Sequence, residues 1–537
     1  MKKRKVKNII IEQLSKFGVK NIYGYAGDTI LHFFSALKES DIKLYTTKHE
    51  GTAGLMASAE GKLTDKLSVC VAHSGPGTAN IINGIADAYS DRVPMLLITG
   101  QVPTYNIGTD YKQFVNHKQL TNPLTVYSAT LVNPHSVVDI FYKAMTKAIT
   151  SGGVSHIVIP MDLWEAKTNA IPREYPPHLN RKTLPQKAVL DKAVKLINKA
   201  KKPIILFGRG SKGSNERLTS LSHRLKAPLI NTLPATGMID IHSNPFYIGG
   251  LGQGGSKIAS QLINESDLIL IFGATWWPMD YTPRRPNVIH FDLTAENISA
   301  LHPVELGIVG DINVSLYHLL QHIQENKNHD WEKKVKFLQK KLIKNITVSA
   351  EDNTTAPFNP GAVINTFSNY FSNNEIITLD SGDNVVWFSK YFNTLCNKLL
   401  LSGSWRTMGF ALPAALASKI NMPDNPVTAI TGDGGLDMVL AELTTAARYN
   451  IAIRLIVINN GTLAMEKNRM ITAGLTQEEV KLTNPDFSKI AEACLLDSIK
   501  IDNFSQLKDI IKKTDNLKKS MLIDIPCKST ILPGTKL

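Results

Sequence analysis

The stretch VTAITGDGGLDMVLAELTTAARYNIAIRLIVINN, residues 427–460, contains two apolar runs separated by a glycine-rich turn and a helical segment. This order is the unit from which parallel α/β sheets are built. If the two strands are neighbours, Asp433 and Asn460 meet at the carboxyl edge of the sheet, where α/β proteins bind ligands. Their oxygens, with a backbone carbonyl and phosphate oxygens, suit Mg²⁺. A glycine turn alone is common after a strand, so the prediction depends on the second strand.

Similar strand-like runs alternate with helical patterns along the rest of the chain, in three blocks. The runs include LSVCVA and MLLITG in the first block, PIILFGRG and DLILIFG in the second, and EIITLD and MLIDIP in the third. Four prolines in residues 170–186 indicate a linker after the first block. The pattern predicts an α/β protein with three consecutive doubly wound parallel-sheet domains. Their expected limits are residues 1–169, 187–320 and 357–537.

Length and charge narrow the class of protein. A chain of 537 residues is long enough for three domains. The formal charge of +14 raises the question of a nucleic-acid partner. The lysines are scattered, however, and their densest clusters lack the interleaved aromatic residues and glycines of a strand-binding groove. We therefore expect a lysine-rich solvated surface and no nucleic-acid partner.

Cysteine usage and hydropathy indicate the compartment. The four cysteines include no close pair, which argues against a disulfide framework and against a zinc site. No apolar stretch approaches the roughly 18 residues of a membrane-spanning helix. Both features are typical of a soluble cytoplasmic protein in a reducing environment.

The motif GDGGLDMVLAELTTAARYNIAIRLIVINN resembles the metal and diphosphate motif of the thiamine diphosphate (ThDP) enzymes, in the pyruvate oxidase, acetolactate synthase and benzoylformate decarboxylase group. In that family the motif begins with GDG and ends with NN. The resemblance implies that Asp433, Asn460 and the carbonyl of Thr462 bind Mg²⁺. It also implies that the backbone of Gly434 and Gly435 holds the diphosphate. Other residues that it implies around the cofactor are Gly27, Asn80, Asp380, Gly432 and Met465.

Three further segments carry the resemblance to the catalytic residues. LYTTKHEGTAGLMASAEGKL is similar to the segment with the family's cofactor-activating glutamate, which falls on Glu50. Such a carboxylate promotes the tautomer of the cofactor's aminopyrimidine ring that accepts a proton. In IGTDYKQFVNH, Gln113 matches the family's active-site glutamine. In GSWRTMGFALPAALA, Met408 falls on the bulky position that props the cofactor in its bent conformation.

The middle block resembles the flavin-binding domain of pyruvate oxidases. GGLGQGG, FGATWWP, FDLTAENI and VGDI occur in the family's order. Glycine loops and a strand-end acid can hold a dinucleotide. Acetolactate synthases keep FAD without redox use and decarboxylases keep the domain without FAD, so the resemblance leaves FAD open. The candidate FAD-binding residues are Gly208, Gly210, Gly252, Gly273, Asp292 and Asp311.

The sequence departs from its relatives where substrate specificity is set. Lys112 stands where the family usually has Phe, Glu466 occupies a normally apolar position, and Arg469 stands where bacterial pyruvate oxidases carry Glu. Arg469 and Lys112 could form an anion-binding pair for the carboxylate of a 2-oxo acid. The alternative is that one or both point to solvent.

Together these features predict a ThDP- and Mg²⁺-dependent enzyme that decarboxylates pyruvate or a related 2-oxo acid. Along the whole chain the resemblance is greatest to pyruvate oxidase. Three fates of the acyl unit stay open: oxidation through FAD, ligation to a second oxo acid, and protonation to an aldehyde. A non-catalytic homologue is the rival from another class, but it predicts loss of Glu50, Asp433 or Asn460, and all three are present.

The resemblance also implies an assembly. In the family the glutamate of one subunit faces the diphosphate domain of another, so we expect a homodimer or homotetramer with active sites at the subunit interface. The sequence runs only to CKSTILPGTKL after its last strand-like run, without the tail that some pyruvate oxidases dock on a membrane. We therefore expect no activation by membranes.

Overall fold

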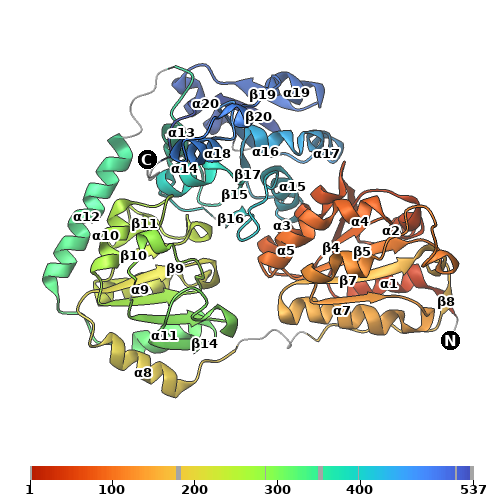
Figure 1. Cartoon of the computed structure of the whole chain (residues 1–537), viewed down its shortest axis with the longest axis horizontal. Coiled ribbons are helices and arrows are strands. Elements are labelled where there is room, and N and C mark those ends of the chain that lie inside the picture. Colours follow the sequence, from red (N-terminus) through yellow and green to blue (C-terminus); the bar gives the residue numbers. More distant parts are fainter. Residues whose placement is uncertain are drawn as a thin grey trace.

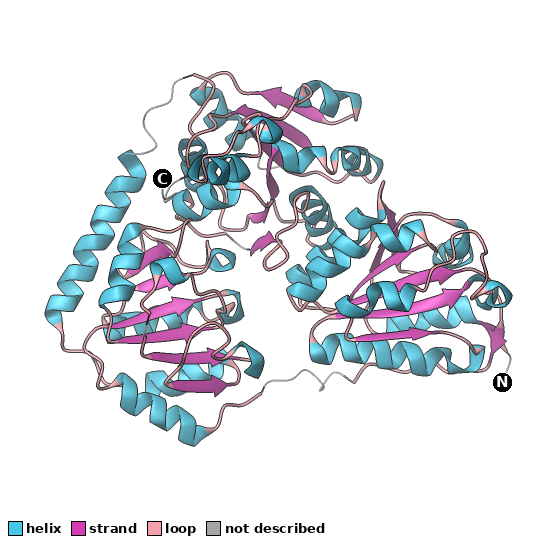
Figure 2. Cartoon of the chain, in the orientation of Figure 1, coloured by secondary structure: helices cyan, strands magenta, loops and turns pink. Residues whose placement is uncertain are grey.

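Three six-stranded parallel sheets, each covered by helices on both faces, make up the protein (Figures 1 and 2). This computed structural model describes residues 3–176, 183–284, 286–348, 355–396, 398–514 and 517–532. The predicted fold class, three doubly wound α/β units in sequence, is confirmed.

The first sheet has the strand order β3-β2-β4-β5-β7-β6. Its strands are β2 (Asn21–Gly24), β3 (Lys43–Thr46), β4 (Ser68–Ala72), β5 (Met95–Gln101), β6 (Tyr127–Thr130) and β7 (Val154–Pro160). The helices are α1 (Val6–Lys16), α2 (Leu31–Leu37), α3 (Glu50–Thr64), α4 (Pro76–Asn80), α5 (Ile82–Ser90), α6 (His117–Thr121) and α7 (Val137–Ser151). A short antiparallel pair, β1 (Arg4–Lys5) with β8 (Lys167–Thr168), joins the ends of this domain.

The middle sheet has the order β11-β10-β9-β12-β13-β14. Its strands are β9 (Pro203–Phe207), β10 (Leu229–Asn231), β11 (Tyr247–Gly250), β12 (Leu268–Phe272), β13 (Val288–Asp292) and β14 (Leu306–Val309). The helices are α8 (Lys187–Ile197), α9 (Asn215–Leu225), α10 (Lys257–Glu265) and α11 (Ile312–His322). The chain order reverses between β9 and β12, which makes the crevice above these two strands a ligand position in folds of this kind.

The C-terminal sheet has the order β16-β15-β17-β18-β20-β19. Its strands are β15 (Ile376–Leu379), β16 (Lys398–Leu401), β17 (Val427–Gly432), β18 (Arg454–Asn459), β19 (Asp497–Lys500) and β20 (Met521–Pro526). The helices are α13 (Pro360–Tyr370), α14 (Asp383–Tyr391), α15 (Ala411–Asn421), α16 (Asp433–Asp437), α17 (Leu443–Arg448), α18 (Ala464–Thr472), α19 (Phe487–Ala493) and α20 (Phe504–Lys513). Strands β17 and β18 pair in parallel, as residues 427–460 predict.

Helix α3 connects the first and third domains. Nearly all of its side chains are buried, because it lies between the first sheet and α15 of the C-terminal domain. Its small residues allow close helix crossings: a Cβ atom on Gly54 would lie 2.9 Å from the Cα atom of Gly84 in α5. The same hydrophobic core therefore includes residues of both domains, and this packing positions the residue at the start of α3, Glu50.

Helix α12 (His329–Val348) links the middle and C-terminal domains along the outside of the molecule (Figure 1). The sequence indicates a solvated helix or linker here, and the structure adds that one face is packed. Trp331, Val335 and Leu338 are buried on that face. The indole of Trp331 donates a hydrogen bond to the carbonyl of Pro203 in β9.

Candidate functional site

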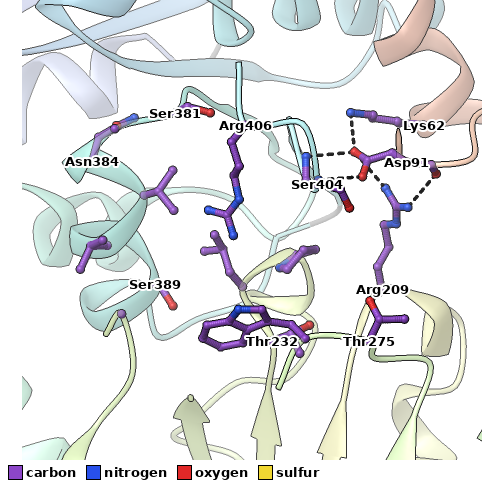
Figure 3. Close-up of a pocket in the computed structure, with 18 of the residues that line it drawn as sticks. Lys62, Asp91, Arg209, Thr232, Thr275, Ser381, Asn384, Ser389, Ser404 and Arg406 are labelled. Carbon is purple, nitrogen blue, oxygen red and sulfur yellow. Dashed lines mark hydrogen bonds and ion pairs between the residues drawn. The ribbon is translucent and has the colours of Figure 1, made fainter. Parts of the chain in front are cut away.

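A cavity of about 1290 Å³ lies between the carboxyl ends of the middle and C-terminal sheets. Its walls come from the turns after β9, β12 and β13 on one side and from those after β15 and β17 on the other. Residues at the ends of α3 and α5 close it from the first domain. Figure 3 shows Arg406 of the C-terminal domain extending into this space toward Thr232 and Thr275 of the middle domain.

Asp433, directly after β17, provides a buried carboxylate at the C-terminal end of the cavity. The residue is 3% exposed. Its Oδ2 atom accepts hydrogen bonds from the backbone N–H of Gly461 and from Nδ2 of Asn484, both at 2.7 Å. Burial raises the pKa of Asp433, an effect that these two donors partly offset. The result is a fixed negative charge with incomplete solvation, which a cation would stabilise.

Asn460 lies at the end of the neighbouring strand β18. Its Nδ2 atom donates to Oδ2 of Asp383 at 3.3 Å, and its Oδ1 atom accepts the N–H of Thr462 at 3.2 Å. Asp383 is buried, and it lines the cavity. Burial, with a contribution from the charge of Asp433, raises the pKa of Asp383 to about 6. One edge of the sheet therefore gathers carboxylate and amide oxygens.

The other residues expected around the diphosphate mostly line the same cavity. These are Met408, Gly432, Gly434, Gly435, Thr462 and Met465. Gly434 has no space for a side chain, because a Cβ atom there would lie 2.8 Å from Cδ2 of Leu463 and 3.4 Å from Cε of Met408. The terminal methyl group of Met408 therefore lies beside the glycine turn, in the position from which it could support a bound group.

Asp380 is buried behind this surface and does not line the cavity. Its carboxylate accepts the backbone N–H of Gly409 at 2.9 Å and the hydroxyl of Thr431 at 3.0 Å. Burial raises its pKa to about 6 against the effect of these donors. Its visible role is to hold the segment after Met408 against the end of β17.

Glu50, the first residue of α3, belongs to a second group in the first domain. It is 4% exposed, and its Oε2 atom accepts a hydrogen bond from Nδ2 of Asn80 at 3.0 Å. Nε2 of His73 lies 3.9 Å from its Oε1 atom. The His73 ring packs so closely on Gly27 that a Cβ atom there would lie 2.4 Å from it. Glu50, Asn80 and Gly27 are therefore gathered around His73.

Gln113 lies at the edge of this second group. Its backbone has a positive φ of 62°, and its carbonyl accepts a hydrogen bond from the hydroxyl of Ser74 at 2.9 Å. Its side chain is exposed. Gly27, Glu50, Asn80 and Gln113 are all absent from the lining of the cavity that contains Asp433. Within one chain, the predicted site residues thus form two separate groups.

The middle-domain residues predicted to hold FAD have different roles. Gly210, Gly273 and Asp292 line the cavity, whereas Gly208 and Gly252 do not. Asp292 accepts hydrogen bonds from the N–H of Thr294 and from the side chain of Asn297, both at 2.9 Å. Asp311 also lies outside the cavity lining. It caps α11 by accepting the N–H of Val314 at 3.0 Å.

The glycines after β9 and β12 serve the packing of two turns against each other. The N–H of Gly210 donates to the carbonyl of Gly273 at 3.0 Å. A Cβ atom on Gly210 would lie 2.8 Å from Cα of Gly273, and one on Gly208 would lie 2.4 Å from the Gly273 carbonyl oxygen. These glycines are explained by backbone packing, and the N–H groups of Gly208, Gly210 and Gly273 already donate to backbone carbonyls.

The two cations suggested as an anion-binding pair do not meet at this cavity. Arg469 lines it, but its side chain is 70% exposed and pairs with Glu466 at 2.9 Å. Lys112 is exposed and is absent from the cavity lining. Glu466 is thus paired with Arg469 on the exposed face of α18.

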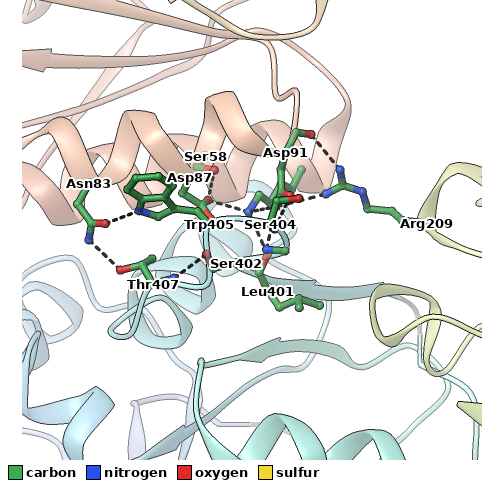
Figure 4. A network of polar contacts seen from close by, with 12 residues as sticks. Ser58, Asn83, Asp87, Asp91, Arg209, Leu401, Ser402, Ser404, Trp405 and Thr407 are labelled. Carbon is green, nitrogen blue, oxygen red and sulfur yellow. Dashed lines mark hydrogen bonds and ion pairs between the residues drawn. The ribbon is translucent and has the colours of Figure 1, made fainter. Parts of the chain in front are cut away.

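A polar network joins all three domains at the side of the cavity (Figure 4). Lys62 of α3 pairs with Asp87 at 2.7 Å and with Asp91 at 2.8 Å. The Asp91 carboxylate also accepts the N–H groups of Gly403 at 2.9 Å and Ser404 at 3.0 Å. Arg209 of the middle domain donates to the Asp91 carbonyl at 2.9 Å. Burial opposes ionisation of Asp91, but Lys62 and Arg209 hold its pKa well below the usual range.

Sequence reasoning missed several of these residues. Asp383 follows Asp380 by three positions after the apolar run EIITLD, so the strand-end acid was a usable signal. His73 directly precedes the SGPG loop, but nothing local indicates that its ring faces Glu50. Asn484 and Arg406 carry no local signal either, because their roles depend on what lies opposite them.

Two negative findings apply to the described part of the chain. No group of three or more His, Cys, Asp or Glu side chains there is arranged to hold a metal ion. A metal at Asp433 would therefore need amide, carbonyl or external oxygens as well. No described helix is both long enough and apolar enough to cross a membrane.

Comparison with known sequences gives matches along the whole chain. Residues 4–121 match the N-terminal TPP binding domain of thiamine pyrophosphate enzymes. Residues 190–319 match the central domain of these enzymes, and residues 380–525 match their C-terminal TPP binding domain. Each match contains one of the three parallel sheets in whole or in large part.

Individual relatives cover almost the full chain. A putative thiamine pyrophosphate-containing protein, YdaP of Bacillus subtilis, is 30% identical over 530 residues, covering 96% of this chain and 90% of the relative. A probable acetolactate synthase large subunit of Methanocaldococcus jannaschii is 31% identical, with coverage of 96% and 90%. The pyruvate oxidase of Lactiplantibacillus plantarum is 26% identical, with coverage of 96% and 87%. These identities do not separate the synthases from the oxidase.

Proposed function

This chain belongs to the thiamine pyrophosphate enzymes, and from that premise we propose that it uses ThDP and Mg²⁺ to decarboxylate pyruvate or a related 2-oxo acid. The acyl unit is then passed on, by oxidation as in a pyruvate oxidase or by ligation as in an acetolactate synthase. The observation that carries the proposal is the oxygen-rich edge at Asp433 and Asn460. Asp433 and Thr462 of this edge line a cavity large enough for a cofactor and a substrate.

The metal is held by Asp433, Asn460 and the carbonyl of Thr462. The fit is chemical: Mg²⁺ prefers oxygen ligands and keeps some water, and this edge supplies a carboxylate, an amide and a carbonyl. The buried Asp433, with its raised pKa, supplies the negative charge for which a cation compensates. Met408 and the glycine turn bound the space beside it.

In this proposal Glu50 is the residue that exchanges a proton with the cofactor. When bound, ThDP supplies the carbon nucleophile and the electron sink for decarboxylation. The Oε2 atom of Glu50 already accepts from Asn80, so Oε1, which faces His73 at 3.9 Å, is the atom that exchanges a proton with the cofactor ring. Burial of Glu50 at the start of α3 holds its carboxylate in place.

Two copies of the chain complete each active site. The Glu50 group and the Asp433 cavity are separate within one chain, yet the proposed chemistry needs both at one cofactor. Pairing of the Glu50 face of one copy with the Asp433 face of another satisfies this requirement and gives two equivalent sites in a twofold dimer.

Mixed dimers test this arrangement. Chains with Glu50→Gln and chains with Asp433→Ala are each expected to be inactive. Co-expression should restore about one quarter of wild-type activity, because half of the dimers are mixed and each of these has one intact site. Activity that is not restored by mixing, in dimers shown to be mixed by tag-selective purification, would contradict a shared site.

The fate of the acyl unit is tested by the absorbance spectrum of the purified protein. One cavity joins the Asp433 edge to the strand ends of the middle domain, the position where such sheets bind dinucleotides, which favours a flavin-containing oxidase or synthase over a decarboxylase without flavin. A flavin band that bleaches when pyruvate, ThDP and Mg²⁺ are added supports the oxidase. A band that does not bleach, with formation of a ligated product, favours the synthase. Absence of a band, with release of an aldehyde, favours a decarboxylase.

A further inference from the structure

The guanidinium group of Arg406 lines the large cavity, and the negative charge of Asp91 acts on it electrostatically. Within the described ranges of the chain, the guanidinium group makes no hydrogen bond or ion pair. Other cations that line the cavity do: Lys62 pairs with Asp91, Lys212 with Asp65, and Arg469 with Glu466. Figure 3 shows Arg406 pointing from the C-terminal domain toward the middle domain.

The loop that carries Arg406 is held on both sides of it. Asn83 of α5 accepts a hydrogen bond from the indole of Trp405 at 2.8 Å and donates one to the hydroxyl of Thr407 at 2.9 Å. Asp91 fixes the backbone of Gly403 and Ser404 (Figure 4). The neighbours of Arg406 are thus anchored to the first domain, while its own side chain is directed the other way, into the cavity.

The backbone at Arg406 is strained. Its φ of 60° lies in the left-handed region, which glycine adopts freely and a residue with a Cβ atom does not. This strained backbone is not needed to hold the loop, because Asn83 and Asp91 already do so. Strain at a cavity wall is a reason to look for a function of the side chain.

The space that Arg406 faces is the dinucleotide position of a doubly wound sheet. It lies above the carboxyl ends of β9 and β12, where the strand order reverses. In many such sheets a glycine turn binds the diphosphate through its N–H groups. Here the N–H groups of Gly208, Gly210 and Gly273 already bond to backbone carbonyls, so a phosphate requires donors from side chains.

Suitable side-chain donors face this space from both domains. The donors of the C-terminal domain are Arg406 and the hydroxyl group of Ser389 on α14. Those of the middle domain are the hydroxyl groups of Thr232 and Thr275 (Figure 3). The carboxylates of Asp383 and Asp433 lie on the C-terminal wall, at the ends of β15 and β17. An anionic group is therefore favoured beside Arg406 and a cation beside Asp433.

We propose that Arg406 binds the diphosphate of a dinucleotide cofactor that lies across the ends of β9 and β12. This inference rests on the proposed function only in assigning the cofactor to the class of flavin dinucleotides. A guanidinium group can bind two phosphate oxygens at once. The domain that holds Mg²⁺ and ThDP thus also supplies the charge that holds the dinucleotide.

The test uses the full-length protein freed of nucleotides and titrated with FAD, followed by flavin fluorescence. Arg406→Gly should weaken FAD binding about 10- to 100-fold, as expected for the loss of charged hydrogen bonds to a phosphate. The FAD affinity of Arg406→Lys should lie between those of the wild type and Arg406→Gly. Binding of riboflavin, which has no phosphate, should be the same in all three proteins. Lys212→Ala, which removes a cavity cation that is already paired, should bind FAD as the wild type does.

A second measurement separates binding from a structural role. Because glycine fits a φ of 60° without strain, Arg406→Gly should unfold at the same temperature as the wild type or at a higher one. A lower unfolding temperature in parallel with weaker FAD binding would overturn the proposal. So would unchanged FAD affinity, including a case in which only the KM for pyruvate rises. Arg406→Met provides the same affinity test if the glycine variant does not fold.

The proposed function can fail separately. Wild-type protein that binds ThDP with Mg²⁺ but does not bind FAD would overturn the role of Arg406 and leave ThDP chemistry standing. Protein that binds FAD through Arg406 but does not bind ThDP would contradict the proposed function and support this inference.

Discussion

Two turns of this molecule have the same form and opposite charge. Gly208-Arg209-Gly210 follows β9 in the middle sheet, and Gly432-Asp433-Gly434 begins at the last residue of β17 in the C-terminal sheet. The side chain of Arg209 is 46% exposed and reaches across to Asp91 of another domain. Asp433 is 3% exposed and is held by partners of its own domain. A glycine turn after a strand therefore indicates a position at the edge of the sheet. The residue between the glycines decides which groups the turn binds.

The surroundings of the two turns explain the difference. After β17, neighbouring strands bring Asn460 and Asp383 to the same edge, so the acid becomes part of an oxygen-rich surface. After β9, the glycines pack against the turn that follows β12, and the arginine joins a network between domains. One turn is suited to bind a cation, and the other contributes to the junction of the three domains.

The largest effect is expected at the acidic turn. Asp433→Asn should lower the affinity for Mg²⁺ and ThDP by about 100-fold or more, because even outer partners of metal ligands cost about 10- to 100-fold when removed. Calorimetric titration of ThDP in the presence of Mg²⁺ measures this. Asp437→Asn, which changes an exposed acid four residues later, is the control. An equal loss in both variants would mean that the turn has no special role.

Substitutions at the junction of the three domains, which the basic turn contacts, should lower the stability of the protein. Asp91→Asn leaves the buried ammonium group of Lys62 with Asp87 as its one carboxylate partner among the described residues, beside the carbonyl of Leu401. The free energy of unfolding should fall by about 3 kcal/mol, the lower end for breaking a buried ion pair. Denaturant titration measures the change. Asp65→Asn, which breaks the exposed pair with Lys212, should have little effect, and similar losses in the two variants would refute the distinction.

Asp380 lies behind the acidic turn, and its contribution to the stability of the protein should depend on pH. Burial raises the pKa of Asp380 to about 6 from the unfolded value near 3.8. The folded state thus binds the proton more tightly, so this group's contribution to stability is complete below pH 4. It is lost as the pH rises toward 6, by about 2 kcal/mol. Denaturant unfolding between pH 4 and 7 should show this decline relative to Asp380→Asn. Parallel curves for the two proteins would argue against it.

The smallest effect is expected at the basic turn itself. Arg209→Ala removes a half-exposed partner of Asp91 while Lys62, Gly403 and Ser404 still bond to that carboxylate. Stability should fall by less than about 1 kcal/mol, as for other exposed ion pairs. Comparison with Asp91→Asn under identical conditions measures the difference. A loss as large as that of Asp91→Asn would show that the arginine, not the lysine, holds the junction.

Much of the architecture could be predicted because it depends on local pattern. Buried parallel strands appear as short apolar runs, and glycine turns and helical periodicity separate them, so the three sheets follow from the sequence. The pairing of β17 with β18 follows from the short connection between them. Asp311 shows the limit of this reasoning: a strand-end acid suggested a ligand, but its carboxylate caps a helix.

The sequence by itself determined the fold class, the family and the acidic turn at Asp433, because each depends on residues that are close together in the chain. Only the tertiary structure decided that His73 lies beside Glu50, and that Arg209 forms an ion pair whereas Arg406 forms none with the described residues. The physical reason is that pairing and burial depend on which distant segments pack together. That packing is set by the cores shared between domains, and no local run of residues encodes it.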